Sequence, residues 1–374
     1  MVRASHIYRL GIKELWSLWR DPMMLILIVW GFTAMIYVAA SAMPESLSKV
    51  PISIVDEDDS PLSVRISAAF FPPQFMPPMR VTLAEVDAGL DAGLYTFSLN
   101  IPPNFQRDVL AGRMPTIQLN VDATRITQAF TGTAYVQQIV MGEVNAFVQG
   151  YRANATMPVE LAMRARFNPN LSQSWFGALM EVINMVTMLS IILSGAALIR
   201  EREHGTIEHL LVMPVTPGEI MLGKVWSMGL VVLLATAFSL QFIVQGVLAV
   251  PIEGSVLLFL AFTAIFLFST TSLGIFLATL ARNMPQFGLL MMLVLLPMLM
   301  LSGGVTPRES MPMLARNIME IAPSTHFVAA AQGILYRGAG FDVVWPQFLA
   351  LAIIGAVFFF AAMLHFRKSI SQMA

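Results

Sequence analysis

Six stretches of almost uncharged, apolar residues constrain the fold of this chain more than any other feature. They cover residues 23–42, 176–199, 225–250, 256–280, 287–304 and 348–366. About 20 apolar residues in an α-helix cross the roughly 30 Å hydrocarbon core of a bilayer. With 56% hydrophobic and 12% charged residues, the chain is too apolar for a soluble globular protein. The sequence therefore predicts a polytopic α-helical membrane protein with six transmembrane helices.

The segment before the first stretch, residues 1–22, predicts an amphipathic helix that lies in the membrane interface, because its apolar and charged side chains follow helical spacing. Asp21 and Pro22 supply an N-cap and a proline at the first helical position, so the first span is expected at residues 23–42. Cleavage of a signal peptide near Ala42 is the alternative. The apolar region is longer than the roughly 7 to 15 residues of such peptides, which favours an uncleaved span.

Residues 43–174 form the only long hydrophilic region of the chain. Alternating apolar and polar residues predict strands at 51–55, 95–101 and 116–121, and a last extended segment at 163–167. Helices are predicted at 61–70, 83–91, 103–111 and 127–151. This mixture predicts a compact α/β domain inserted between the first two spans. The acidic run 56–59 fits a solvated turn after a strand better than a cation site.

Basic residues are distributed unevenly between the two sides of the predicted spans. If the N-terminus lies in the cytoplasm, the inner segments carry ten of them: Arg3, Arg9, Lys13, Arg20, Arg200, Arg202, Lys224, Arg282, Arg367 and Lys368. The short outer loops then carry three, Arg308, Arg316 and Arg337. The positive-inside rule ignores long domains and places both termini, residues 200–224 and the tail 367–374 in the cytoplasm. The 43–174 domain is then extracytoplasmic.

The region 175–366 holds the second to sixth predicted spans, and its fifth span is irregular. That span is short, carries Pro297 and ends in a run rich in Gly, Pro and Thr. Two segments too short to span follow within residues 305–345 and predict outer re-entrant helices. The many methionines of this region suit either lipid-facing filler or an adaptable surface for apolar ligands.

The polar insert 200–224 contains a short amphipathic helix by its pattern. Ile207, Leu210 and Leu211 share one face between Gly205 and Pro214. Such a helix either lies on lipid headgroups or offers its apolar face to a soluble partner, and spacing favours neither.

The segment Gly218–Lys224 matches the phosphate-loop pattern G-x-x-x-x-G-K, but its context contradicts a nucleotide site. Val225 stands where Ser or Thr binds magnesium. Thr216 and Glu219 form a capping box with Pro217 at the first helical position, which places the segment in a helix.

Other side chains give little evidence of chemistry. His204 and His209 are five residues apart, on different faces of a helix, so no metal site is predicted. The chain has no Cys, which excludes disulfides and thiol chemistry, and no basic cluster that indicates nucleic acid. Glu181 and Asn184 share one face near the outer end of the second span, and polar residues inside a membrane are candidates for function.

Residues 201–224 resemble the cytoplasmic motif of type-2 ABC transporter permeases, the membrane subunits of bacterial exporters. The similar residues are E-R-E-x-G-T-I-E over 201–208, L-L-V-M-P over 210–214 and E-I-x-x-G-K over 219–224. R-D-P at 20–22, N-P at 168–169, Gly303 and Pro307 agree with the same family. The similarity covers the whole chain and points to the YhhJ-like inner-membrane permeases. In place of the usual Pro-Gly before the second span, this chain has Phe176-Gly177, which leaves the start of that helix open.

The resemblance implies a permease of the bacterial inner membrane without an ATPase site or cofactor of its own. A separate cytoplasmic ATPase would bind ATP and magnesium, a second copy or a sister permease would complete the transporter, and a periplasmic adaptor (membrane fusion) protein commonly takes part. The expected coupling residues are Glu201, Glu203, Gly205, Thr206, Ile207, Glu208, Leu210, Leu211 and Pro214.

We expect this chain to export an amphiphilic or hydrophobic, drug-like or lipid-like substrate. Candidates for the translocation pathway are Glu181, Asn184, Met188, Met291 and Met298. A secondary transporter is one alternative, but it would need charges deep in the spans and broken helices in inverted repeats. A membrane sensor with an external ligand-binding domain is the other, but it does not explain five further spans.

Overall fold

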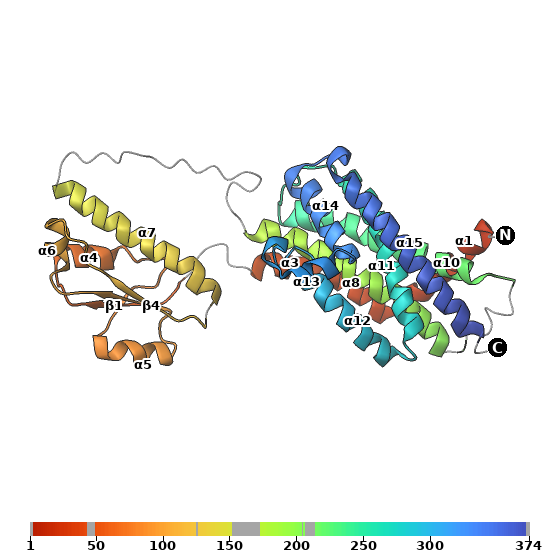
Figure 1. Cartoon of the computed structure of the whole chain (residues 1–374), viewed down its shortest axis with the longest axis horizontal. Coiled ribbons are helices and arrows are strands. Elements are labelled where there is room, and N and C mark those ends of the chain that lie inside the picture. Colours follow the sequence, from red (N-terminus) through yellow and green to blue (C-terminus); the bar gives the residue numbers. More distant parts are fainter. Residues whose placement is uncertain are drawn as a thin grey trace. The chain divides into compact units, whose positions relative to one another are not determined.

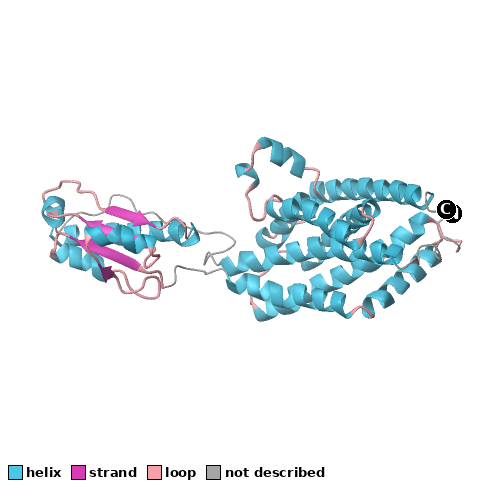
Figure 2. Ribbon diagram, turned by 90° about the horizontal axis from the view of Figure 1, so that it is seen from below, coloured by secondary structure: helices cyan, strands magenta, loops and turns pink. Residues whose placement is uncertain are grey.

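The computed structural model describes residues 3–42, 49–124, 126–151, 173–203, 205 and 214–371. The chain divides into two compact units: residues 1–43 together with 165–374, and residues 44–164. Figure 2 shows helices in both units and strands in residues 44–164. The predicted extended segment 163–167 lies outside the described residues.

Helices make up the first unit. In chain order they are α1 (Ala4–Trp19), α2 (Pro22–Trp30), η1 (Gly31–Met35), α3 (Ile36–Ala42), α8 (Gln173–Glu203), α10 (Pro217–Phe238), η3 (Ser239–Val247), α11 (Val256–Leu280), α12 (Met284–Met300), η4 (Arg308–Ser310), α13 (Met313–Met319), α14 (Pro323–Arg337) and α15 (Phe341–Ser371). The beginning of α1 and the end of α15 lie at the same end of this unit (Figure 1).

Five helical segments of the described residues are long and apolar enough to cross a membrane: Pro22–Ser41, Ser174–Glu203, Pro217–Val247, Val256–Leu280 and Phe341–Lys368. They correspond to five of the six predicted spans. The remaining one corresponds to α12, which has 17 residues and a length of roughly 26 Å. Pro297 lies inside α12, as expected from the sequence. A span at α12 therefore stays a prediction.

Helix α8 lies at the centre of the helical unit, because 83% of its most apolar 18-residue segment is buried. Small residues bring its neighbours close. A Cβ added to Gly274 of α11 would lie 2.6 Å from the carbonyl oxygen of Ile191 in α8, and Ser190 Oγ donates a hydrogen bond to Thr270 Oγ1 over 2.7 Å. Small residues and interhelical hydrogen bonds are typical of tightly packed membrane helices.

The short helix α14 is held by aromatic packing. Phe327 stacks on Phe266 of α11 with ring centroids 3.8 Å apart, and it also stacks on Phe262 of α11 at 5.8 Å. Phe327 and Ile334 are fully buried. Protein therefore covers much of this helix, which is the condition under which a short helix is tolerated at membrane depth.

The second unit is an α/β fold. Its helices are α4 (Pro61–Ala68), η2 (Leu83–Glu85), α5 (Val86–Asp91), α6 (Phe105–Leu110) and α7 (Ile126–Tyr151), and its strands are β1 (Ile52–Asp56), β2 (Met79–Arg80), β3 (Phe97–Ile101) and β4 (Gln118–Val121). The strand order is β2-β1-β3-β4; β1 runs parallel to β2 and β3, whereas β3 and β4 are antiparallel. The structure confirms the three predicted strands within its described residues and adds β2.

One face of the sheet carries the core of this unit. Ile52, Ile54, Phe97 and Leu99 alternate along β1 and β3 and pack under α4, α6 and α7. Figure 1 shows α5 on the opposite face. The acidic run after β1 forms a turn, in which Asp56 Oδ1 accepts hydrogen bonds from the amides of residues 58 and 59. No cluster of metal-ligating residues occurs within the described parts of the chain.

Candidate functional site

The N-terminal helix α1 packs along the beginning of α10, and two glycines make the approach possible. A Cβ on Gly11 would lie 2.1 Å from the Trp226 indole, and a Cβ on Gly223 would lie 2.9 Å from Leu10. Trp226 Nε1 donates a hydrogen bond to the carbonyl oxygen of Ile7 over 3.0 Å. The predicted amphipathic helix at residues 1–22 is thus a helix that contacts protein with one face.

An ionic cluster with a buried centre joins three helices at this point; we call it the Lys224 cluster, and its members are Lys13, Glu14, Glu201 and Lys224. Lys224 Nζ lies 2.9 Å from Glu14 Oε1 and 2.7 Å from Glu201 Oε2. Lys13 pairs with the other oxygen of Glu201. The side chain of Lys224 is only 2% exposed. The two ammonium groups and the two carboxylates have a net charge of zero. Such pairing offsets the free-energy penalty of removing charges from water.

The α1 members of the cluster have shifted proton affinities. Burial raises the pKa of the Glu14 carboxyl; the Lys224 ammonium acts against this shift and Glu201 adds to it, and the pKa stays raised overall. Burial lowers the pKa of Lys13, but the neighbouring Glu201 carboxylate outweighs burial, so this pKa is raised. Lys13 is therefore held in its charged form, and Glu14 is easier to protonate than an exposed glutamate.

The end of α8 is also tied to three other helices. Arg200 pairs with Asp21, and Asp21 Oδ1 accepts a hydrogen bond from the amide of Met24, which caps α2 as predicted. Arg202 Nη1 donates to the carbonyl oxygen of Ala281 at the end of α11. Glu203 Oε1 accepts from the amide of Met284 at the beginning of α12 over 2.8 Å. The last turn of α8 is therefore a junction of α2, α11 and α12.

Helix α10 begins with the predicted capping box. Thr216 Oγ1 accepts from the Glu219 amide, and Glu219 Oε2 accepts from the Thr216 amide over 2.7 Å. Glu219 Oε1 also accepts from the amide of Arg3, which fixes the beginning of α1. The segment 218–224 lies inside α10, which confirms that its phosphate-loop pattern is helical.

The expected coupling residues are only partly described. Glu201 is buried in the Lys224 cluster, whereas Glu203, Gly205 and Pro214 are exposed. Gly205 has a φ of 67°, a left-handed conformation that favours glycine and follows directly after α8. Thr206, Ile207, Glu208, Leu210 and Leu211 lie outside the described residues, so the amphipathic helix stays a prediction.

Comparison with known proteins decides the family. The profile of the ABC-2 family transporter proteins matches residues 22–364. The chain belongs to the ABC-2 transporter family. It is 61% identical over 374 residues, the full length of both chains, to the inner membrane transport permease YhhJ of Escherichia coli K12.

Two more distant relatives of this ABC-2 protein extend the comparison. The probable multidrug ABC transporter permease YbhR of Escherichia coli K12 is 27% identical over 364 residues, or 96% of this chain and 97% of YbhR. The ABC transporter G family member 20 of Dictyostelium discoideum is 26% identical over 204 residues, which cover 54% of this chain and 28% of that protein. The resemblance to type-2 ABC permeases is confirmed.

The pathway candidates of the ABC-2 chain fall into two groups. Glu181 and Asn184 are partly buried on one face of α8, and Asn184 Nδ2 donates a hydrogen bond to Glu181 Oε2 over 3.2 Å. Met298 is part of the hydrophobic cluster between α8, α10, α11, α12 and α15, and Met188 and Met291 pack against that cluster. Their predicted role in translocation stays a prediction.

The sequence alone did not predict the Lys224 cluster of this ABC-2 protein. From the sequence, Lys224 is one of the inner basic residues and part of a motif, and Glu14 is one charged residue of the segment 1–22. A lysine directly before the apolar run 225–250 is the signal that indicates a buried partner, because an unpaired ammonium is costly at that position. Nothing in the sequence alone indicates which carboxylate it pairs with.

Proposed function

We propose that this chain is the permease subunit of an ATP-driven exporter in the bacterial inner membrane, and that it moves an amphiphilic or hydrophobic molecule outward. Membership of the ABC-2 family supports a transport function. YhhJ is named an inner membrane transport permease and YbhR a probable multidrug permease, which supports the membrane and the substrate class. ATP and magnesium would bind to a separate cytoplasmic ATPase.

The observation that carries this proposal is the joining of α1, α8 and α10 by the Lys224 cluster. Residues 204–216 connect α8 to α10 in sequence. Glu201, near the end of α8, and Lys224, near the beginning of α10, fix both helices to α1. An ATPase that pushes on residues 206–213 would therefore move the three helices together rather than bend one end. Glu181 lies 20 residues before Glu201 on α8, which is roughly 30 Å along the helix. Movement of α8 would then reach the Glu181–Asn184 pair.

The remaining partners follow the same proposal. A second copy or a sister permease would complete the pathway along the Glu181 face of α8, and residues 44–164 would lie on the outer side, where a periplasmic adaptor protein is a fitting partner. Both termini would lie in the cytoplasm. The chain itself would catalyse no reaction. Its role would be to convert movement of the ATPase into opening of the substrate pathway to the other side of the membrane.

Chemical cross-linking tests this proposal cleanly, because the chain contains no Cys and a single introduced thiol is unique. We expect Leu211→Cys to form a cross-link with the partner ATPase, and Met313→Cys, on α13, to form none. Leu211→Asp should weaken ATPase binding and ATP-dependent export into inverted vesicles. Export that continues without any ATPase, or unchanged ATPase binding in Glu208→Ala and Leu211→Asp variants, would contradict the proposal.

A further inference from the structure

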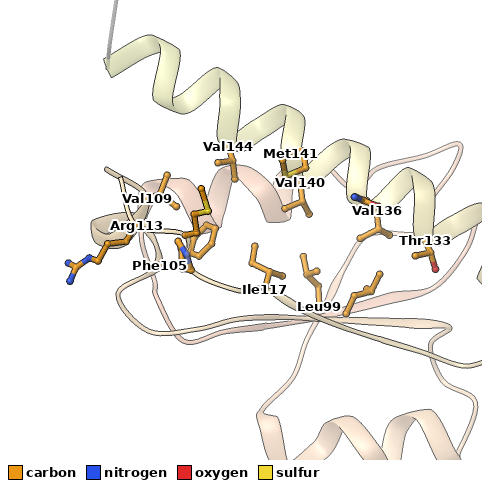
Figure 3. A pocket seen from close by; sticks show the side chains of 14 residues that line it. Leu99, Phe105, Val109, Arg113, Ile117, Thr133, Val136, Val140, Met141 and Val144 are labelled. Atoms are coloured by element: carbon orange, nitrogen blue, oxygen red, sulfur yellow. The ribbon is translucent and has the colours of Figure 1, made fainter. Parts of the chain in front are cut away.

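The α/β unit contains a cavity of about 610 Å³ between its sheet and the long helix α7. Figure 3 shows Val136, Val140 and Val144 pointing from α7 toward Leu99 and Ile117. Sites for small molecules have volumes of roughly 300 to 1,000 Å³. The cavity therefore has the size of a ligand site, in a unit separate from the helical unit.

The lining of the cavity is apolar and partly rigid. Eleven of its 14 lining residues are apolar; the others are Arg113, Thr133 and Gln137. Leu99 and Phe105 are 1% and 3% exposed, so the inner wall belongs to the core of the unit. An apolar wall with a few polar groups at the rim is typical of sites that take an apolar body and orient it by one polar end.

Two methionines lie at the rim of the cavity. Met114 is 98% exposed and Met141 is 54% exposed, although both line the cavity. Methionine is flexible and polarisable and adapts to apolar partners of different shape. The rim is therefore suited to closing over ligands that differ in outline.

The charges at this rim favour an anionic group. Arg113 is the one cation among the lining residues. Asp108 Oδ1 lies 2.8 Å from Arg113 Nη2 and 3.4 Å from Arg107 Nε, so these three side chains together carry one net positive charge. Arg65 of α4 pairs with Glu143 of α7, so these two charges balance each other. Guanidinium groups bind carboxylates, sulfonates and phosphates well because they donate several hydrogen bonds in one plane.

We propose that this cavity binds a small amphiphile that has an apolar body and one anionic group, the anion lying at Arg113. A protein segment would contact the rim from outside and would leave the space beneath α7 unfilled, which favours a small molecule. Only one part of this inference rests on the proposed function, namely that the bound molecule is a transported substrate. Binding itself requires neither ATP nor export.

The test uses the full chain in phosphatidylcholine nanodiscs without the ATPase. The probe is a long-chain fatty acid that carries a photoreactive diazirine, and its neutral methyl ester is the comparison. Mass spectrometry locates the labelled peptides and reports the oligomeric state. We expect labelling within residues 99–119 and 133–144, and stronger labelling by the acid than by the ester.

Four variants sharpen the test. Val140→Trp fills the cavity, and Met141→Trp narrows its mouth from an exposed position that the fold tolerates; each should reduce labelling at least about tenfold. Arg113→Gln should weaken binding of the acid roughly two- to fivefold and leave the ester unchanged, because exposed ion pairs are weak. Arg80→Gln removes an exposed cation from β2, at the other edge of the sheet, and should change neither.

Several results would overturn the inference. One is labelling confined to the membrane helices, and another is full labelling of a folded Met141→Trp variant. If the acid and the ester bind equally well, and Arg113→Gln changes neither, the ligand does not need an anionic group. If Met141→Trp changes the oligomeric state and leaves the labelling unchanged, the rim is a protein–protein contact rather than the mouth of a ligand site. Intact labelling in a chain that fails to export contradicts only the proposed function.

Discussion

Lys224 Nζ lies 2.9 Å from Glu14 Oε1, although 210 residues separate the two in the chain. Both side chains are buried, and Glu201 is the second carboxylate of the same ammonium. The contact joins the N-terminal helix to the end of α8 and to the beginning of α10. It makes the 201–224 motif of this permease part of a folded structure that extends beyond the motif itself.

Lys224→Met is expected to destabilise the permease by roughly 3 to 5 kcal/mol, because it leaves two carboxylates buried without their shared cation. Lys13→Met is the matched control: Lys13 is 46% exposed, and its loss should cost about 1 kcal/mol or less. Thermal unfolding in detergent measures both. Equal melting temperatures for Lys224→Met and the wild-type protein would contradict the role given to the cluster.

The stability of the helical unit should depend on pH through Glu14. Its pKa is raised above the ordinary 4.5, chiefly by burial, so the folded state binds this proton more tightly than the unfolded state does. The stabilisation is complete below about pH 4.5 and is lost as the pH rises through the folded-state pKa. The melting temperature of the wild-type protein should therefore fall as the pH rises above about 4.5, and Glu14→Gln should make this fall smaller.

The pKa of Glu85 is shifted in the opposite direction to that of Glu14, so its effect on stability has the opposite pH dependence. Hydrogen bonds from the Thr82 amide and hydroxyl lower the pKa of Glu85 below 4.5, so its stabilisation is present above that pH and is lost as the pH falls through the folded-state value. Glu85→Gln should lower the stability of the α/β unit at neutral pH and leave the response of the helical unit unchanged. The same pH dependence in both variants would contradict these assignments.

Gly11→Ala should loosen α1 from α10, since the new Cβ would overlap the Trp226 indole at 2.1 Å. Overpacking of this kind costs roughly 1 to 3 kcal/mol. Gly218→Ala is the control, because its nearest neighbour is Met363 Sδ at 3.8 Å and alanine favours a helix. Limited proteolysis of residues 1–20 reports the detachment. Equal cleavage rates in the two variants would show that the close approach is unimportant.

The orientation of the chain is open to a direct measurement. Met114→Cys places a thiol on the exposed rim of the cavity in the α/β unit, and Pro214→Cys places one at an exposed position in the connection between α8 and α10. In intact spheroplasts, a membrane-impermeant maleimide should modify the first thiol and spare the second. Reversal of this pattern would place residues 44–164 in the cytoplasm.

Local patterns predicted much of this fold. The capping box of Thr216 and Glu219, the cap at Asp21 and the alternation along β1 and β3 depend on neighbours in sequence, and the structure confirms each. Strand β2 has two residues, too few to show a period. The Lys224–Glu14 pair and the cavity under α7 depend on how distant elements pack, and a single sequence carries no record of that packing.

The 210-residue separation of Glu14 and Lys224 also has a consequence for synthesis of the permease. A ribosome that adds roughly 5 to 20 residues per second needs about 10 to 40 seconds to pass from one residue to the other. During that interval α1 has no α10 to pack on, and Glu14 lacks the buried ammonium of Lys224. The first helix must therefore exist without this contact while the α/β unit is made, and the contact forms only when α10 has been synthesised.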